Sequence, residues 1–257
     1  MHLRFLADRL RAGETVFCGW SALTDPLAAE AMARTGFDAV CLDMQHGFHD
    51  VQSLRGGLTG IVAAGAAPVL RVPFGGLPEV GRGLDLGFEV VICPMIDSES
   101  DAIAFARAAK YPPLGGRSWG PARAMMLTGS SKEAFLQTAN RRTLAFAMVE
   151  TREALGQLDR ILAVEGIDGV FVGPSDLSIS LAQGASIGPG VEGLAEAIKM
   201  VAQRAAAHGR IAGAFAQTRE DALAYAAAGY RFIATGPDLQ LLAAAAADLI
   251  RSLRNPT

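Results

Sequence analysis

Short apolar runs alternate along the chain with longer segments whose apolar residues recur at helical spacing. The runs are rich in β-branched residues, and we expect strands at 15–20, 38–43, 67–72, 89–94, 143–150, 169–173, 210–215 and 231–235. Most of these runs are apolar throughout, which indicates strands that are buried on both faces, as in a parallel sheet.

Helical patterns separate the strands, at 26–36, 51–65, 77–87, 101–111, 152–166, 192–209, 219–229 and 238–254. Several of them end on glycine, a common residue just after a helix. Eight strands that each precede a helix predict an α/β fold, the (β/α)8 TIM barrel, which commonly takes about 250 residues. Because no linker divides the chain, we expect a single domain over 1–257. A doubly wound open sheet is the alternative fold.

Composition narrows the classes of function. Apolar residues make up 51% of the chain, but no uninterrupted run approaches the roughly 20 residues of a membrane span. The net charge of -3 argues against a nucleic-acid partner. Residues 1–15 lack the apolar segment of a signal peptide and are expected to form a short amphipathic helix. With Cys18, Cys41 and Cys93 inside strand-like runs, we expect reduced thiols and a cytoplasmic protein.

Polar residues end several of the apolar runs. Asp43, Gln45 and His46 follow the second strand, Arg71 ends the third, Glu150 ends the fifth, and Gly173-Pro174-Ser175-Asp176 follows the sixth. The carboxyl ends of barrel strands meet at one rim, where barrel enzymes carry out their chemistry. The sequence therefore predicts that these side chains gather around one site.

Glu150 and Asp176 stand at the ends of adjacent strands and together form a hard oxygen site that suits Mg or Mn. The alternative is that each carboxylate caps the helix that follows it. Arg71 would bind an anionic or ketone oxygen through its fork of donors. Its alternative role is a salt bridge at the barrel rim.

His46 is the one histidine of four that directly follows a strand, so it is the best candidate for a general base. The spacing to His49 also allows metal ligation, and Asp43 either orients His46 or simply ends the strand. Residues 173–176 open a helix whose free amides would bind a substrate carboxylate. The similar turn at 235–238 is expected to place Asp238 as a helix cap.

Two further features affect the chemistry. None of the three lysines, Lys110, Lys132 and Lys199, ends a strand, which argues against a Schiff base. Carbonyl activation would then depend on a metal acting as a Lewis acid. The long connection at 111–131 is expected to fold over a site or onto a neighbouring subunit, with a surface excursion as the alternative.

Motifs spread from about Gly19 to Asp238 resemble the HpcH/HpaI aldolase family of metal-dependent class II pyruvate aldolases. They are GFDAVCLDMQHG, LRVP, VVICPMIDS, YPPLGGRSWG, MVET and, most diagnostic, EGIDGVFVGPSDLS. The resemblance implies reversible cleavage of 4-hydroxy-2-oxo acids to pyruvate, or hydroxypyruvate, and an aldehyde. It also implies a divalent metal cofactor, Mg, Mn, Co or Zn.

The resemblance assigns roles to individual residues. It matches His46 to the base, Arg71 to the enolate-stabilising arginine, and Glu150 and Asp176 to the metal ligands. It matches Ser175 and Asp176 to the amides that hold pyruvate, with Gly173 and Pro174 in the same turn. It matches Trp20 to the pocket lining, and Asp85 to an aspartate that supports the histidine across a subunit interface. Met148 stands where some members carry glutamine.

The resemblance further implies a homo-oligomer, a trimer of dimers with an exchanged C-terminal helix, and no nucleic-acid or membrane partner. Two other functions stay open from the residues. One is an acyl-CoA lyase of the same superfamily, of the malyl- or citryl-CoA type. The other is a non-catalytic barrel that binds an oxo acid.

Overall fold

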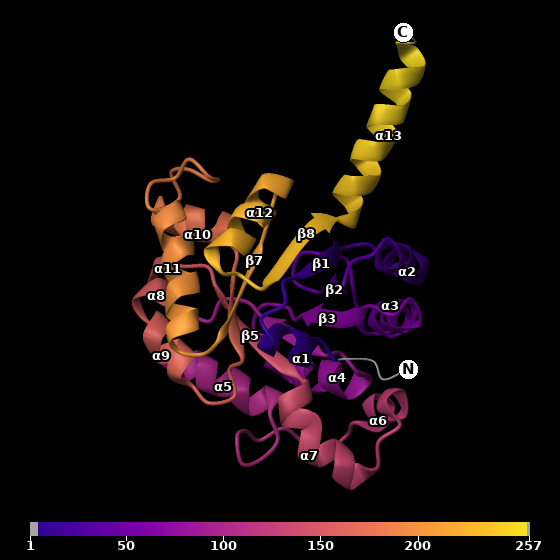
Figure 1. Cartoon of the computed structure of the whole chain (residues 1–257), viewed down its shortest axis with the longest axis vertical. Coiled ribbons are helices and arrows are strands. Elements are labelled where there is room, and N and C mark those ends of the chain that lie inside the picture. The colour runs from indigo at the N-terminus through magenta and orange to yellow at the C-terminus, as the bar shows by residue number, and fades with distance from the viewer. Residues whose placement is uncertain (1–4, 256–257) are drawn as a thin grey trace.

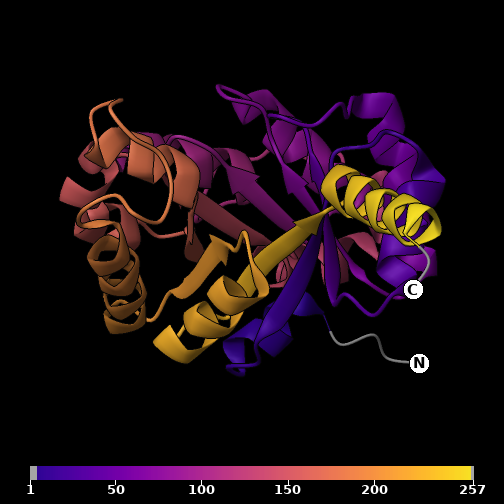
Figure 2. The ribbon, with the colours of Figure 1, turned by 90° about the horizontal axis from the view of Figure 1, so that it is seen from above.

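The barrel is seen directly in the computed structural model, which describes residues 5–255. Eight parallel strands close on themselves in sequence order, β1 to β8, and helices surround them (Figures 1 and 2). The predicted (β/α)8 barrel is therefore confirmed, and the open sheet is excluded.

The strands agree with the sequence prediction to within two residues at either end. They are β1 (Val16–Ser21), β2 (Ala39–Asp43), β3 (Ala67–Arg71), β4 (Val90–Cys93), β5 (Leu144–Val149), β6 (Gly169–Val172), β7 (Ile211–Phe215) and β8 (Phe232–Pro237). Nearly every residue in them is buried, as expected for strands with side chains on one face inside the barrel and on the other beneath the helices.

The helices follow the predicted periodicity, with some additions. They are α1 (Leu6–Arg11), α2 (Pro26–Arg34), α3 (Val51–Ala63), α4 (Leu77–Leu86), α5 (Glu99–Ala109), α6 (Ala122–Thr128), α7 (Lys132–Arg142), α8 (Arg152–Gly156), α9 (Leu158–Ala163), α10 (Pro174–Leu181), α11 (Leu194–Ala207), α12 (Arg219–Ala228) and α13 (Asp238–Arg254). Helix α1 lies within the expected N-terminal amphipathic segment.

Three parts of the helical prediction were wrong or incomplete. The helix expected at 152–166 is interrupted at Gln157, which lies outside helical geometry with ψ 5°. The connection at 111–131 contains α6, and α7 was not predicted at all. Helix α7 has a weak apolar pattern because it buries only Phe135 and Ala139.

Two apolar cores hold the barrel together. One fills its interior and includes Trp20, Phe146, Phe171 and Phe232. The ring centroids of Phe146 and Phe232 lie 5.1 Å apart, a normal spacing for packed aromatic pairs. The other core lies between the strands and the helices. These two layers fix the strand ends, and therefore the side chains at the rim.

Helix α13 projects away from the barrel (Figure 1). Its apolar side chains are largely exposed, among them Leu242 at 62% and Leu253 at 68%. Among the residues described, no helix has both the length and the apolar character needed to cross a membrane.

Candidate active site

A pocket of about 330 Å³ opens at the carboxyl ends of the strands. It brings together most of the residues singled out from the sequence: Trp20, Asp43, His46, Arg71, Met148, Glu150, Gly173, Pro174, Ser175 and Asp176. Further lining comes from Phe171, Phe215, Pro237, Leu239 and Gln240. The convergence predicted from the ends of the apolar runs is therefore present, except that Gln45 does not line the pocket. Asp85, which only the resemblance assigned to the site, lies outside it as well.

Asp43 and Arg71 form a buried ion pair at the floor of the pocket. They are neighbours in register as the last residues of β2 and β3. The Arg71 Nη2 and Nε donate to the two oxygens of Asp43, at 2.6 Å and 2.8 Å. Burial by itself would raise the pKa of Asp43, but the Arg71 guanidinium holds this pKa below its usual value. The rim salt bridge considered for Arg71 is thus formed, while Arg71 also lines the pocket.

The Asp43 carboxylate also organises its surroundings. It accepts hydrogen bonds from the backbone amides of Gln45, at 2.9 Å, and His46, at 3.4 Å. It also accepts one from the Trp20 indole nitrogen, at 3.3 Å. Sequence reasoning gave Asp43 only a supporting role for His46 and missed its pairing with Arg71. Two opposite charges that end adjacent strands were the signal that could have revealed it.

Trp20 forms an aromatic wall of the pocket. The Arg71 guanidinium lies 4.8 Å from the centre of its ring, a cation–π distance. The Phe171 ring stacks against the indole at 6.0 Å, and the Phe215 ring meets it edge-on at 5.3 Å. These contacts hold the guanidinium from a second direction, so its position does not depend on Asp43 alone.

Glu150 has a carboxylate oxygen without a hydrogen-bond partner in the pocket. It is only 1% exposed, and Oε2 accepts from the Met95 amide at 3.0 Å. Its Oε1 has no hydrogen-bond partner in the described structure. Burial, reinforced by the nearby charge of Asp176, raises the pKa of Glu150 to about 7. A buried acceptor of this kind needs a proton or a cation.

The backbone makes room for this carboxylate at Gly173. A Cβ atom at this position would lie 2.5 Å from Glu150 Oε1, so any side chain would displace the carboxylate. Neither Glu150 nor Asp176 is the cap that was considered as an alternative. Thr151 caps α8, and α10 begins after Gly173 with Asp176 in its first turn.

The pair Glu150 and Asp176 fits a hard divalent cation. Among residues 5–255 no cluster of three or more histidine, cysteine or acidic side chains could hold a metal. A cation here would therefore have two carboxylate ligands and leave its other positions to water or substrate oxygens, the pattern typical of Mg. The unpartnered Glu150 oxygen and its raised pKa are the observations that favour such an ion.

The first turn of α10 supplies the remaining polar groups. Pro174 occupies its first position, so the first free amides belong to Ser175 and Asp176. The hydroxyl of Ser175 accepts a hydrogen bond from Gln217 Nε2 at 2.9 Å. The positive end of the helix thus lies beside the two carboxylates, where an anion could bind next to a cation.

Asp85 lies away from this pocket within the chain. It belongs to α4 and accepts a hydrogen bond at 2.6 Å from Arg117, whose guanidinium stacks over the Tyr111 ring. Asp85 and Arg117 line a separate cavity of about 570 Å³. The segment 111–131 therefore packs against α4 and does not cover the rim pocket of its own chain.

The structure changes the role expected for Asp238 and shows the surroundings of His49. Asp238 was expected to cap a helix, but its carboxylate accepts from the amides of Ala22 and Leu23, at 3.0 Å and 3.1 Å. It thereby ties the start of α13 to the loop after β1. His49 contacts the hydroxyls of Ser21 and Ser53, at 3.3 Å and 3.2 Å.

The three cysteines are free and buried. Burial raises the pKa of each thiol. Since the thiolate is the reactive form, these residues are poor nucleophiles.

Comparison with known proteins agrees with this geometry. The family model described as HpcH/HpaI aldolase/citrate lyase matches residues 17–245. A hydroxypyruvate/pyruvate aldolase of Rhizorhabdus wittichii is 37% identical, over 94% of this chain and 95% of that protein. A 5-keto-4-deoxy-D-glucarate aldolase of Shigella dysenteriae is 34% identical, over 86% of this chain and 85% of that protein.

Solved structures show the same similarity. An HpcH/HpaI aldolase/citrate lyase family protein from Burkholderia cenocepacia superimposes with a TM-score of 0.87 at 31% identity, covering 97% of this chain and 99% of the other. An HpcH/HpaI aldolase from Desulfitobacterium hafniense superimposes with a TM-score of 0.88 at 26% identity, with 98% of each chain covered.

Proposed function

Because the chain belongs to the HpcH/HpaI aldolase/citrate lyase family, we propose that it is a divalent-metal-dependent aldolase. Its reaction is the reversible cleavage of a 4-hydroxy-2-oxo acid to pyruvate, or hydroxypyruvate, and an aldehyde. The observation that carries the proposal is the buried, unpartnered oxygen of Glu150 beside Asp176. The hydroxypyruvate/pyruvate aldolases among the relatives support the choice of the 2-oxo acid.

Glu150 and Asp176 would hold the cation, which is Mg, Mn, Co or Zn. When bound, a divalent cation supplies Lewis-acid polarisation of the 2-oxo group. The first-turn amides of Ser175 and Asp176 bind the substrate carboxylate at the positive end of α10. Gly173 keeps the space that the Glu150 carboxylate occupies.

His46 moves the proton. In the cleavage direction it accepts the proton of the 4-hydroxyl, directly or through a water, as the C3–C4 bond breaks and the aldehyde forms. The electron pair of that bond passes into the 2-oxo acid, and negative charge develops on its 2-oxo oxygen. Protonation at C3 then gives the 2-oxo acid product. In the synthetic direction the same base removes the proton from C3.

Arg71 stabilises the charge that develops on the enolate oxygen. Its guanidinium is held before substrate arrives, by two hydrogen bonds to Asp43 and by the face of Trp20. Such preorganised donors lower the barrier because they need no rearrangement as charge develops. Met148 gives the pocket an apolar wall where some relatives carry glutamine, so oxo-acid oxygens on that side meet no amide.

The active form is a homo-oligomer, a trimer of dimers, in which α13 is exchanged between protomers. The exposed leucines of α13 support this arrangement, because large apolar patches mark association surfaces. Asp85 then supports His46 across a subunit interface, since the two residues lie in separate cavities of one chain. The free, buried thiols suit a reducing cytoplasm.

The proposal is tested by adding purified, Mg-loaded protein to hydroxypyruvate or pyruvate together with a panel of aldehydes. Formation of the 4-hydroxy-2-oxo acid with any of them supports it. Cleavage of malyl-CoA or citryl-CoA without aldol formation would identify an acyl-CoA lyase instead. Pyruvate binding with neither reaction would identify a binding protein.

A further inference from the structure

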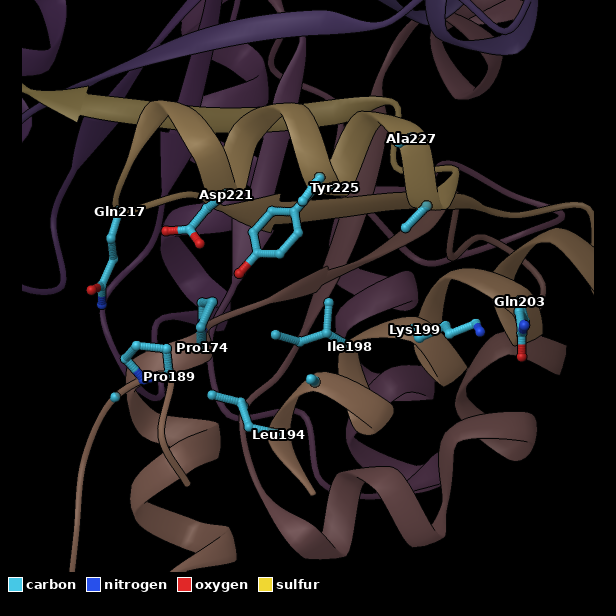
Figure 3. Close-up of a pocket in the computed structure, with 14 residues that line it drawn as sticks. Pro174, Pro189, Leu194, Ile198, Lys199, Gln203, Gln217, Asp221, Tyr225 and Ala227 are labelled. Carbon is cyan, nitrogen blue, oxygen red and sulfur yellow. The ribbon is translucent and has the colours of Figure 1, made fainter. Parts of the chain in front are cut away.

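A third cavity, of about 510 Å³, lies on the outer side of the barrel between α11 and α12 (Figure 3). Leu194 and Ile198 line it from α11, and Ala224 and Tyr225 line it from α12. Pro174, the first residue of α10, lies at one side. The volume of the cavity falls within the range of about 300–1,000 Å³ that is typical of small-molecule sites.

One polar group in this cavity is free to bond a ligand in place of water. The half-buried Tyr225 hydroxyl points into the space between the two helices (Figure 3). Within residues 5–255 no protein group hydrogen-bonds to it, and it is not among the fully buried atoms that lack a partner. The adjacent Tyr230 differs, because its hydroxyl donates to the Ile198 carbonyl at 2.7 Å. Burial raises the pKa of Tyr225 to about 12, so the phenol stays protonated and can donate. Asp221 and Gln217 lie near the same end of the cavity (Figure 3).

The cavity is connected to the active site. Pro174 lines both this cavity and the rim pocket. Gln217, from the cavity wall, donates to the Ser175 hydroxyl at 2.9 Å. A molecule in the cavity would therefore contact the back of the α10 turn whose amides face the rim.

We propose that this cavity binds a small, uncharged aromatic molecule that carries a hydroxyl or carbonyl group, and that its occupancy changes the affinity of the rim pocket for the 2-oxo acid. The shape of the lining favours a flat body, because small alanine side chains of α12 oppose the branched side chains of α11. One lysine and one aspartate line the cavity, so the lining carries no net charge that would favour a charged ligand. The coupling, but not the binding, rests on the proposed function.

Binding is tested with p-cresol as the probe, titrated into the full-length protein and followed by ligand-observed NMR or calorimetry. We expect a dissociation constant of about 1 mM or below. Ala224→Phe places a phenyl ring in the cavity and should abolish binding. Ala206→Phe, on α11 but outside the cavity, should leave binding unchanged. Both alanines are exposed, so neither change threatens the core. Tyr225→Phe should weaken binding by about three- to tenfold, the effect of one hydrogen bond.

Coupling is tested on Mg-loaded protein by titrating pyruvate with and without saturating p-cresol. We expect the pyruvate dissociation constant to change at least about twofold, and pyruvate to change the p-cresol affinity by the same factor. Failure to bind p-cresol, or equal binding by the Ala224 and Ala206 variants, overturns the site. Loss of the oligomer in Ala224→Phe would show that a second copy fills the cavity. Binding of p-cresol by a protein without aldolase activity would overturn the proposed function and leave this site intact.

Discussion

Replacing Glu150 by glutamine should make the metal-free protein more stable at alkaline pH. The folded protein raises the pKa of Glu150 from 4.5 to about 7, chiefly by burial. A carboxyl whose pKa is raised on folding stabilises the fold while it is protonated. That contribution is complete below pH 4.5 and is lost as the pH rises through about 7.

The magnitude follows from the shift. One pKa unit corresponds to about 1.4 kcal/mol, so a shift of this size costs about 3 kcal/mol once Glu150 is ionised in the folded protein. At about pH 8 the metal-free wild type should therefore have a free energy of unfolding up to about 3 kcal/mol below that of Glu150→Gln. At about pH 5 the two proteins should differ by about 1 kcal/mol or less.

The assay is urea denaturation of chelator-treated protein at both pH values, followed by circular dichroism. Glu192→Gln, at an exposed glutamate, is the matched control and should behave as wild type at both. Saturating Mg should raise the unfolding free energy of the wild type at about pH 8, because a ligand that binds only the folded state stabilises it. The unfolding free energy of Glu150→Gln should not change when Mg is added. Equal pH dependence in wild type and Glu150→Gln would refute the reasoning about this buried carboxylate.

Three further changes test the site. Asp43→Asn removes one charge of the buried pair and leaves Arg71 without its counter-ion. The unfolding free energy should fall by about 3–5 kcal/mol, and kcat should fall as well. Gly173→Ala should push the Glu150 carboxylate aside and weaken Mg binding in calorimetry, with the melting temperature of the metal-free protein little changed. His46→Ala should lower kcat by about 10²- to 10⁴-fold while pyruvate affinity is retained, and an unchanged kcat would reassign the base.

The barrel could be predicted because its signals are local. A strand apolar on both faces and an amphipathic helix each leave a periodic pattern, and eight such pairs specify the topology. Helix α7 could not be found in this way, since it buries only Phe135 and Ala139. The interruption at Gln157 also left no trace in the apolar spacing of 152–166.

The rim residues could be located for the same reason, since the end of a strand is visible in the sequence. What they do there depends on tertiary contacts. The pairing of Asp43 with Arg71 follows from strand register, and the raised pKa of Glu150 follows from burial and from Asp176 on another element. Asp85 shows the limit of matching motifs, because one chain places it beside Arg117 and apart from His46.

The central claim is that Glu150 and Asp176 hold a divalent cation on which aldol chemistry depends. The most direct measurement is the rate of pyruvate or hydroxypyruvate release from a 4-hydroxy-2-oxo acid by chelator-treated enzyme, before and after adding Mg, Mn, Co or Zn. We predict no release without metal, recovery with at least one of these ions, and no recovery in Asp176→Ala. Full activity in the metal-free enzyme would contradict the claim.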